Sequence, residues 1–311
     1  MEIKRILVTG RLQEELKHRL DGVIGAELRC LPEDRVTEQD LAWADAYAGF
    51  RPVPGFLPEQ YRWVHALGAG VDAFIHRKPW SEQTILTRTT GDFGRKIAEY
   101  CLGHMLADAQ HHEGFSEDQR ARRWGPQAAV PLAGQAVAVF GTGTIGQTIS
   151  LTLRALGVRA YGISWSGTAH EAFDKTVSLR EAAVVLDQAD WVINTLPLTE
   201  QTEALFDERL IALMKPGCAF INVGRGGSLV EPDLLRALDR GQLRKAVLDV
   251  LSVEPLPDTS PLWSRPDIKI TPHIAAVTDA EEAAQALLDT WNALQQGENL
   301  LANRVNIERG Y

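Results

Sequence analysis

Three residues with complementary chemistry follow short apolar runs in the second half of the chain: Arg225, Glu254 and His273. The planar guanidinium of Arg225 offers paired donors that fit a carboxylate. A nearby Glu254 carboxylate would favour the charged imidazolium of His273. A charged imidazole can give a proton to a carbonyl oxygen as a hydride arrives, and the neutral ring can take the proton back from the alcohol. The trio therefore predicts acid–base chemistry on a small acid with an oxo or hydroxyl group.

Each of these residues alone is more typical of a structural ion pair. Together they follow the strand candidates 219–223, 245–250 and 268–271. In an open parallel sheet the carboxyl ends of the strands line one crevice, where ligands bind. We therefore expect the three side chains to converge, although they lie far apart in the sequence.

A glycine-rich turn precedes this region, where Gly141, Gly143 and Gly146 follow the apolar run 136–140. Strand, glycine turn and amphipathic helix in this order are typical of a dinucleotide site. Gly141 allows a tight turn, Gly143 lets the backbone approach the phosphates, and Gly146 lets the helix lie close to the strand. The helix would then offer unpaired N–H groups and its positive end to the anion.

Strand and helix candidates alternate along the chain, which predicts parallel sheets covered by helices. Strands are expected at residues 4–9, 28–31, 46–50, 63–66 and 85–87 of the first unit. A long helix over 97–112 and an irregular polar stretch over 113–127 follow. In the second unit we expect strands at 137–140, 159–163, 191–195, 219–223, 245–250 and 268–271, and helices at 178–186, 207–214 and 231–240. A last helix, 279–296, could return to the first unit.

Composition and charge narrow the class of protein. The 311 residues are 45% hydrophobic and 23% charged, as in ordinary globular proteins. A net charge of −9 argues against a nucleic-acid partner, and no apolar run reaches the about 20 residues of a membrane helix. Cys30, Cys101 and Cys218 are too scattered for a disulfide framework or a zinc site and suit a reducing compartment. Without a signal-peptide pattern, these features predict a cytoplasmic protein.

The motifs in chain order resemble those of the D-isomer-specific 2-hydroxyacid dehydrogenase family. They occupy residues 67–72, 97–100, 141–146, 223–226, 248–255 and 261–275. Within the family, the chain is most similar to the short glyoxylate/hydroxypyruvate reductases. The resemblance implies an α/β fold of two doubly wound parallel-sheet domains, with a Rossmann nucleotide-binding domain (99–275) inserted in a flavodoxin-like substrate domain (1–98 and 276–311). It also implies an oxidoreductase that transfers a hydride between NAD(P)H and a small 2-oxo acid, and a homodimer joined through the nucleotide domains.

The resemblance further implies roles for the residues at matching positions. Arg225 would bind the substrate carboxylate and polarise the keto oxygen, His273 would be the acid and base, and Glu254 would be its partner. The N–H groups near three substrate-loop residues of the other domain would also hold the carboxylate; they are Ala69, Gly70 and Val71. The implied cofactor-binding positions are Gly141, Gly143, Thr144, Ile145, Gly146, Ser164, Trp165, Ser166, Leu196, Pro197, Val223, Gly224, Asp249 and Ala275. Among them, Asp249 would receive the nicotinamide carboxamide.

The segment 162–167 bears on the choice of cofactor. An acidic residue after the second nucleotide strand normally binds the ribose 2′-hydroxyl and repels a 2′-phosphate. Here Ser164 and Ser166 stand in that region without a carboxylate, and either could bind a hydroxyl or a phosphate. The missing repulsion favours NADP(H), although the nearest cations are His170 and Lys175 and no arginine lies in the turn.

Alternatives stay open at this point. A non-catalytic, NAD(H)-sensing protein like the corepressors that resemble this family would share the glycine turn, whereas the trio favours an enzyme. His104, Asp108 and His111 share one helix, but they leave a metal site short of ligands, so no metal is expected. Arg51 follows a strand candidate and could meet a substrate or simply face solvent.

Overall fold

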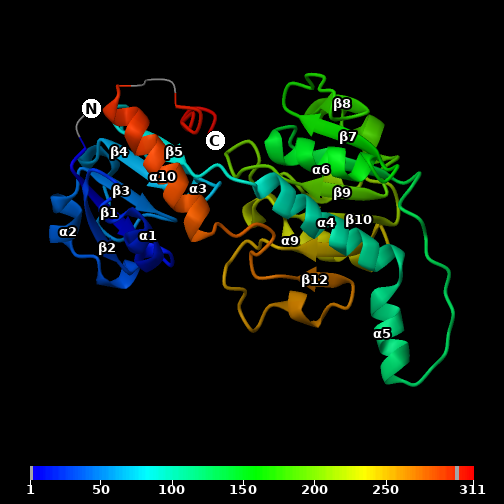
Figure 1. Cartoon of the computed structure of the whole chain (residues 1–311). Coiled ribbons are helices and arrows are strands. Elements are labelled where there is room, and N and C mark those ends of the chain that lie inside the picture. Colours follow the sequence, from blue (N-terminus) through cyan, green and yellow to red (C-terminus); the bar gives the residue numbers. More distant parts are fainter. Residues whose placement is uncertain (1–2, 298–300) are drawn as a thin grey trace. The chain divides into compact units, whose positions relative to one another are not determined.

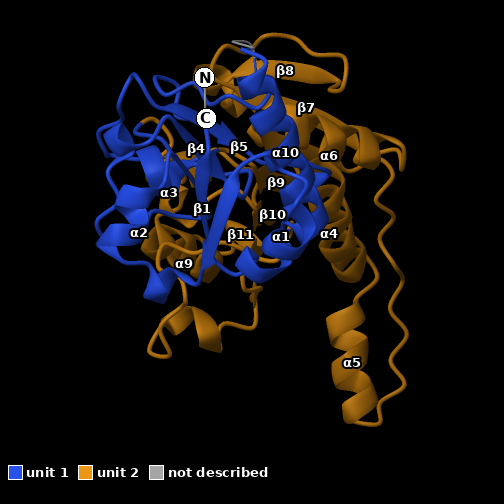
Figure 2. Cartoon of the chain, turned by 60° about the vertical axis from the view of Figure 1, so that its left-hand side comes forward, with its two compact units in different colours: residues 1–93, 197–200, 277–311 blue, residues 94–196, 201–276 orange. Residues whose placement is uncertain are grey.

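The computed structural model describes residues 3–297 and 301–311, and the chain divides into two compact units (Figure 1; Figure 2). Unit 1 consists of Met1–Phe93, Pro197–Glu200 and Val277–Tyr311, and unit 2 of Gly94–Leu196 and Gln201–Ala276. These limits differ from the expected ones, because residues 94–98 and 276 belong to unit 2 and 197–200 to unit 1. A Cβ added to Gly94 would lie 2.6 Å from the Thr148 hydroxyl, a close approach that fixes this segment within unit 2.

Unit 1 contains a five-stranded parallel sheet in the order β2-β1-β3-β4-β5, which is the flavodoxin-like order. Its strands are β1 (Arg5–Thr9), β2 (Glu27–Leu31), β3 (Ala46–Gly49), β4 (Trp63–Ala66) and β5 (Ile85–Arg88). Its helices are α1 (Gln13–Leu20), α2 (Glu38–Trp43), α3 (Asp72–Ile75) and α10 (Ala280–Gln295). Apolar residues of α1 and α10 pack into one core cluster, and those of α2 and α3 into another. The expectation missed α2, which a capping box between Thr37 and Asp40 begins.

Unit 2 contains a seven-stranded parallel sheet in the order β12-β11-β10-β9-β6-β7-β8. Its strands are β6 (Ala136–Phe140), β7 (Arg159–Ser164), β8 (Lys175–Ser178), β9 (Trp191–Asn194), β10 (Cys218–Asn222), β11 (Leu243–Leu248) and β12 (Ile268–Ile270). Its helices are α4 (Phe93–Ala109), α5 (His112–Arg120), α6 (Thr144–Arg154), α7 (Ala183–Leu186), α8 (Glu208–Ile211) and α9 (Glu231–Asp239). The strand order reverses at β6, as in a Rossmann sheet. The predicted fold class is confirmed. Of the helices described, none is both long and apolar enough to span a bilayer.

Two sequence expectations for unit 2 were wrong. The single helix predicted over 97–112 starts earlier and is followed by a second helix, α5, in the stretch predicted to be irregular. His111 takes a left-handed conformation with φ of 56°, which separates the two helices. Glu113, in the first turn of α5, lies 2.8 Å from Lys245 and 3.2 Å from Lys269. Ion pairs with residues distant in the sequence therefore hold a helix that the local sequence pattern did not predict. The edge strand β8 was also missed.

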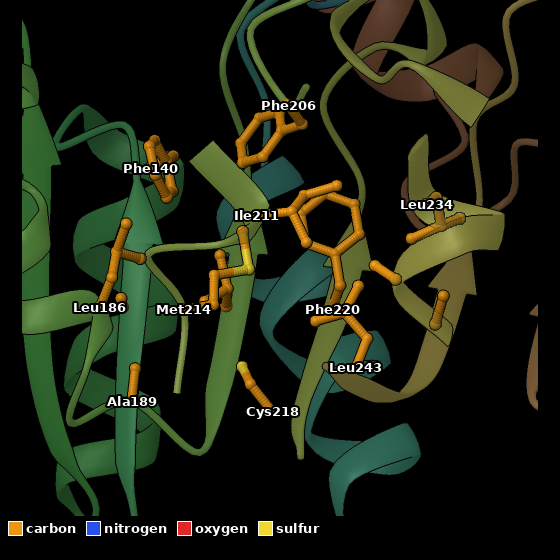
Figure 3. Packing of buried hydrophobic residues seen from close by; sticks show 14 of the residues in the cluster. Phe140, Leu186, Ala189, Phe206, Ile211, Met214, Cys218, Phe220, Leu234 and Leu243 are labelled. Atoms are coloured by element: carbon orange, nitrogen blue, oxygen red, sulfur yellow. The ribbon is translucent and has the colours of Figure 1, made fainter. Parts of the chain in front are cut away.

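The core of unit 2 supports the strand ends that carry the predicted site (Figure 3). The Phe206 ring lies 4.8 Å from that of Phe140 and 5.0 Å from that of Phe220, between centroids. Phe206 also donates to Ser228 O over 2.9 Å and accepts from Val230 N over 3.1 Å. Aromatic pairs of this kind contribute about 0.5–1.5 kcal/mol beyond their buried area. The same residue therefore packs against the end of β6 and the middle of β10, and its backbone holds residues 228 and 230 of the segment after β10.

His65 on β4 makes the stability of unit 1 sensitive to acid. The ring is fully buried, with Nδ1 2.8 Å from Thr87 Oγ1 and Nε2 3.2 Å from Thr89 Oγ1, and burial lowers its pKa to about 3. The unfolded chain binds a proton at this residue below about pH 6.5, whereas the folded chain does not. We expect this residue to reduce the free energy of unfolding by up to about 1.4 kcal/mol per pH unit between about 6.5 and 3. In urea titrations, His65→Gln should show a shallower pH slope over this range, and an unchanged slope would contradict the assignment.

Candidate active site

The carboxyl ends of β10, β11 and β12 form one row at the edge of the unit 2 sheet. Asn222, Leu248 and Ile270 are the last residues of these strands, and each pairs directly with the next across the sheet. The three loops with the predicted catalytic residues therefore leave the sheet side by side. Gly226 shows how close two of them come, since a Cβ added there would lie 1.9 Å from the Leu251 carbonyl carbon.

His273 and Glu254 form a direct pair. His273 Nδ1 lies 2.9 Å from Glu254 Oε2, and Leu251 N donates to Glu254 Oε1 over 2.9 Å. Burial alone would raise the pKa of the Glu254 carboxyl, but the hydrogen bonds from His273 and Leu251 and the charges of His273 and Arg225 together lower it. Glu254 is therefore ionised at neutral pH and holds the imidazole by Nδ1. Within the described chain Nε2 has no partner, and the side chain is 48% exposed, so this nitrogen can meet a substrate oxygen.

Arg225 lies near this pair, since its charge contributes to the lowered pKa of Glu254. The backbone at Arg225 is fixed from both sides, because its carbonyl accepts from Ser228 Oγ over 2.6 Å and from Asn222 Nδ2 over 3.2 Å. Arg225 Nη1 donates to Gly224 O over 2.7 Å. The structure thus brings the guanidinium, the carboxylate and the imidazole of the sequence prediction to one edge of one sheet.

A buried amide network positions the Arg225 loop, and the sequence analysis missed it. Asn194 Nδ2 donates to Asn222 Oδ1 over 2.9 Å and to Ser228 Oγ over 2.8 Å, and all three residues are fully buried. Asn194 Oδ1 accepts from Leu196 N over 3.0 Å, and Asn222 Oδ1 from Gly224 N over 3.2 Å. Both asparagines are the last residues of apolar strands, and this position could have indicated the network from the sequence. A buried amide group at the end of such a strand must form its hydrogen bonds with nearby groups.

The glycine turn fits a dinucleotide pyrophosphate. Gly141 has φ of +104°, and a Cβ added to Gly146 would lie 1.9 Å from Gly141 O, so any side chain there would disrupt the turn. Thr144 and Ile145 begin α6, and Gly143 is its N-cap residue, without a side-chain cap. Within the described residues the N–H groups of these three have no acceptor. The start of α6 therefore presents the free donors and the close backbone approach that such an anion needs.

The turn after β7 is built from hydroxyl groups. Ser164 Oγ accepts from Gly167 N over 3.1 Å, and Ser166 Oγ lies 2.8 Å from Thr168 Oγ1. Trp165 between them is 65% exposed. Lys175 pairs with Tyr161 across the sheet whereas Ser164 pairs with Ser178, so this lysine stands at the other end of the strands.

The remaining predicted cofactor positions fall into two places. Leu196 ends its segment of unit 2, and Pro197 is the first residue of the stretch that belongs to unit 1. Val223, Gly224, Asp249 and Ala275 all lie in the loops after β10, β11 and β12. Asp249 is only 2% exposed, and its carboxylate accepts hydrogen bonds from nearby groups, including one from Ala275 N over 2.9 Å.

The predicted substrate loop of unit 1 follows β4. Within the described chain the N–H groups of Ala69, Gly70 and Val71 have no acceptor, so they are available to an anion. Arg88, at the end of β5, donates to Ala69 O over 3.2 Å and orients the loop; sequence reasoning gave no reason to select it. Burial lowers the pKa of the Arg88 guanidinium. Arg51, by contrast, forms an ion pair with Glu33 at 2.6 Å.

The residues considered for a metal have other partners. Asp108 pairs with Arg244 at 2.7 Å and with Lys245 at 3.1 Å, and His111 Nε2 lies 3.0 Å from Ala128 O. In the part of the chain that the structure describes, no group of three or more potential metal-binding side chains gathers.

Known proteins are similar to this chain in sequence and in architecture. The family "D-isomer specific 2-hydroxyacid dehydrogenase, NAD binding domain" matches residues 102–275. Glyoxylate/hydroxypyruvate reductase A of Salmonella paratyphi B is 33% identical over 299 residues, which cover 93% of this chain and 95% of the relative.

Two solved structures superpose closely on the whole chain. A D-isomer specific 2-hydroxyacid dehydrogenase from Xanthobacter autotrophicus, in complex with NADPH and MES, has a TM-score of 0.89 with 28% identity over 100% of both chains. An NADPH-dependent glyoxylate/hydroxypyruvate reductase from Sinorhizobium meliloti, in complex with NADP and sulfate, has a TM-score of 0.87 with 27% identity and covers 99% of this chain and 100% of that one. As its motifs indicated, this chain belongs to the D-isomer specific 2-hydroxyacid dehydrogenase family and is an NAD(P)-dependent oxidoreductase.

Proposed function

We propose that the protein reduces a short 2-oxo acid such as glyoxylate or hydroxypyruvate. The observation that carries the proposal is the His273–Glu254 pair at 2.9 Å, on the sheet edge that Arg225 shares. The names of the relatives support this substrate class, since the Salmonella protein is a glyoxylate/hydroxypyruvate reductase.

The chemistry divides among the residues of the site. A reduced nicotinamide dinucleotide, with its pyrophosphate held at the 141–146 turn, would supply the hydride. Arg225 binds the substrate carboxylate through its fork of donors and polarises the keto oxygen. The free N–H groups of residues 69–71 are proposed as anion-binding groups of unit 1. The His273 imidazolium gives the proton on Nε2 to the keto oxygen, and Glu254 stabilises the charged ring beforehand. In the oxidation direction the neutral ring takes the hydroxyl proton.

A substrate panel tests the proposal. The purified protein is mixed with NADPH or NADH and with glyoxylate, hydroxypyruvate, pyruvate and longer 2-oxo acids, and the absorbance of the reduced cofactor is followed. We expect consumption with the short acids and progressively less with the longer ones. No consumption with any acid would contradict the proposal.

We further propose NADP(H) as the preferred cofactor, because the Ser164–Thr168 turn contains hydroxyl groups and no carboxylate. Ser164→Asp should lower the ratio of kcat/KM with NADPH to kcat/KM with NADH about 10- to 100-fold, because the new charge repels the 2′-phosphate. Aspartate can still accept from Gly167 N, so the turn is retained. Ser164→Asn is the uncharged control. Equal ratios in the two variants would show that charge at this position does not select the cofactor.

We propose that two copies of the chain associate through α5 and the segment after it. None of the residues of α5 is buried, and the chain returns from it as an extended segment that stands away from the unit 2 sheet (Figure 1). Trp124 is 97% exposed, Val130 52% and Phe115 37%, a concentration of apolar surface typical of a protein interface.

We also propose that the protein is located in the cytoplasm. Its three cysteines form no disulfide bond, which suits that reducing compartment.

The molecular mass in solution, measured by light scattering coupled to size-exclusion chromatography, checks the association. The wild type should have twice the 34.3 kDa of one chain. Trp124→Asp combined with Phe115→Asp should shift the mass to that of one chain, because each buries a charge in the interface. Val184→Asp, on the exposed side of α7, should leave the mass unchanged. A wild type with the mass of one chain would refute the association.

A further inference from the structure

The Asp249 carboxylate is committed to the loop that carries His273. Asp249 Oδ1 accepts from Thr271 Oγ1 over 2.6 Å and from Ile274 N over 2.8 Å, and Oδ2 accepts from Ala275 N over 2.9 Å. All three donors belong to residues 271–275. His273 N in turn donates to Asp249 O over 2.9 Å. Residues 271–275 are thus hydrogen-bonded to Asp249, whose buried side chain makes no hydrogen bond to the His273 ring.

Tyr100 of α4 extends this arrangement by one hydrogen bond. Its hydroxyl lies 2.6 Å from Thr271 Oγ1. Threonine has a single hydroxyl hydrogen, and Thr271 gives it to the Asp249 carboxylate, so Tyr100 must be the donor to Thr271. Burial, reinforced by the charge of Asp249, raises the pKa of the Tyr100 phenol despite the bond to Thr271, so the phenol keeps its proton. The direction of donation is therefore fixed, from Tyr100 through Thr271 to Asp249.

The backbone of His273 explains why such an anchor is needed. His273 has φ of 55°, in the left-handed region. This conformation is unfavourable for a residue with a side chain, which persists in it only when the surroundings impose it. Relaxation of φ would redirect the Cα–Cβ bond and take the imidazole away from Glu254.

We propose that Tyr100, Thr271 and Asp249 are positioning residues for the reaction, a hydrogen-bonded chain that holds His273 in the conformation in which Nδ1 meets Glu254. The proposal rests on the proposed function, in which His273 transfers the proton. It gives Asp249 a role through the loop, in addition to the contact with the nicotinamide carboxamide that the family resemblance implies.

Variants of Thr271 test the chain. Thr271→Val keeps the shape of the side chain but removes the hydroxyl group, whereas Thr271→Ser keeps the hydroxyl group. We expect Thr271→Val to lower kcat about 10- to 100-fold, with the KM for the oxo acid and the Kd for NADPH within about threefold of the wild type, because binding groups remain while the proton donor is misplaced. Thr271→Ser should restore kcat to within about threefold of the wild type. Tyr100→Phe should lower kcat less than Thr271→Val does, since it removes only the outer bond.

Hydrogen exchange gives a readout that does not depend on turnover. The amides of Ile274 and Ala275 donate to Asp249, so their exchange, followed by mass spectrometry of a peptide covering 271–276, should be faster in Thr271→Val and return to the wild-type rate in Thr271→Ser. Unchanged exchange in Thr271→Val would overturn the proposal, and so would faster exchange with an unchanged kcat. A wild type that reduces no oxo acid would refute the proposed function, whereas the exchange rates would still decide whether Thr271 fixes the loop.

Discussion

Replacement of His273 by alanine should lower kcat for 2-oxo acid reduction about 10²- to 10⁴-fold, the range that a positioned general acid contributes. The variant loses the proton that Nε2 gives to the keto oxygen, and water must supply it. NADPH binding, measured by the fluorescence of the bound cofactor, should stay within a few-fold of the wild type, because the glycine turn and α6 are untouched. Steady-state kinetics with glyoxylate and hydroxypyruvate measure the loss.

Two further variants serve as comparisons for His273→Ala, one at its partner and one at an unrelated histidine. Glu254→Gln keeps the size of the side chain but removes the charge that favours the imidazolium, so it should also lower kcat, by less than His273→Ala does. His18→Gln changes an exposed histidine of α1 and should have no effect. Undiminished turnover by His273→Ala would disprove the proton-transfer assignment.

Arg225→Lys should raise the KM for the oxo acid about 10- to 100-fold. The wild-type guanidinium offers two parallel donors to a carboxylate, and the lysine ammonium is a point charge on a flexible stem that cannot reproduce this geometry. A loss of about 1.5–3 kcal/mol, typical of one hydrogen bond to a charged group, corresponds to this range. The KM is measured at saturating NADPH with several short oxo acids.

The matched control is Arg240→Lys, which changes an exposed arginine of unit 2 that pairs with Glu208 at 2.8 Å. It should leave both kcat and KM unchanged. If Arg225→Lys also keeps the KM of the wild type, groups other than Arg225 bind the carboxylate.

Several features of the site follow from local sequence. Gly141, Gly143 and Gly146 determine the turn, because the positive φ at the first and the 1.9 Å approach at the last tolerate no side chain. Arg225, Glu254 and His273 could be selected because each follows a buried strand, and parallel neighbours end at a common edge. Their order along the chain matches the order of β10, β11 and β12 across the sheet.

Other features depended on partners distant in sequence. The segment predicted to be irregular forms α5, which Lys245 and Lys269 anchor through Glu113. The network of Asn194, Asn222 and Ser228 joins residues that no motif connects. The unit limits also differ from the prediction, since residues 197–200 belong with the chain termini.

The sequence by itself determined the fold class and the glycine turn, and it selected the proposed acid–base pair, since these depend on residue type and on position after apolar runs. Only the tertiary structure decided what orients that pair. From the sequence, Asp249 had an implied role at the cofactor but no link to His273, and Thr271 and Tyr100 had no role of their own. Their hydrogen bonds form because the fold places Thr271 Oγ1 2.6 Å from Asp249 Oδ1 and 2.6 Å from the Tyr100 hydroxyl of α4. Such contacts join residues that are distant in the sequence, so they produce no periodic pattern in it.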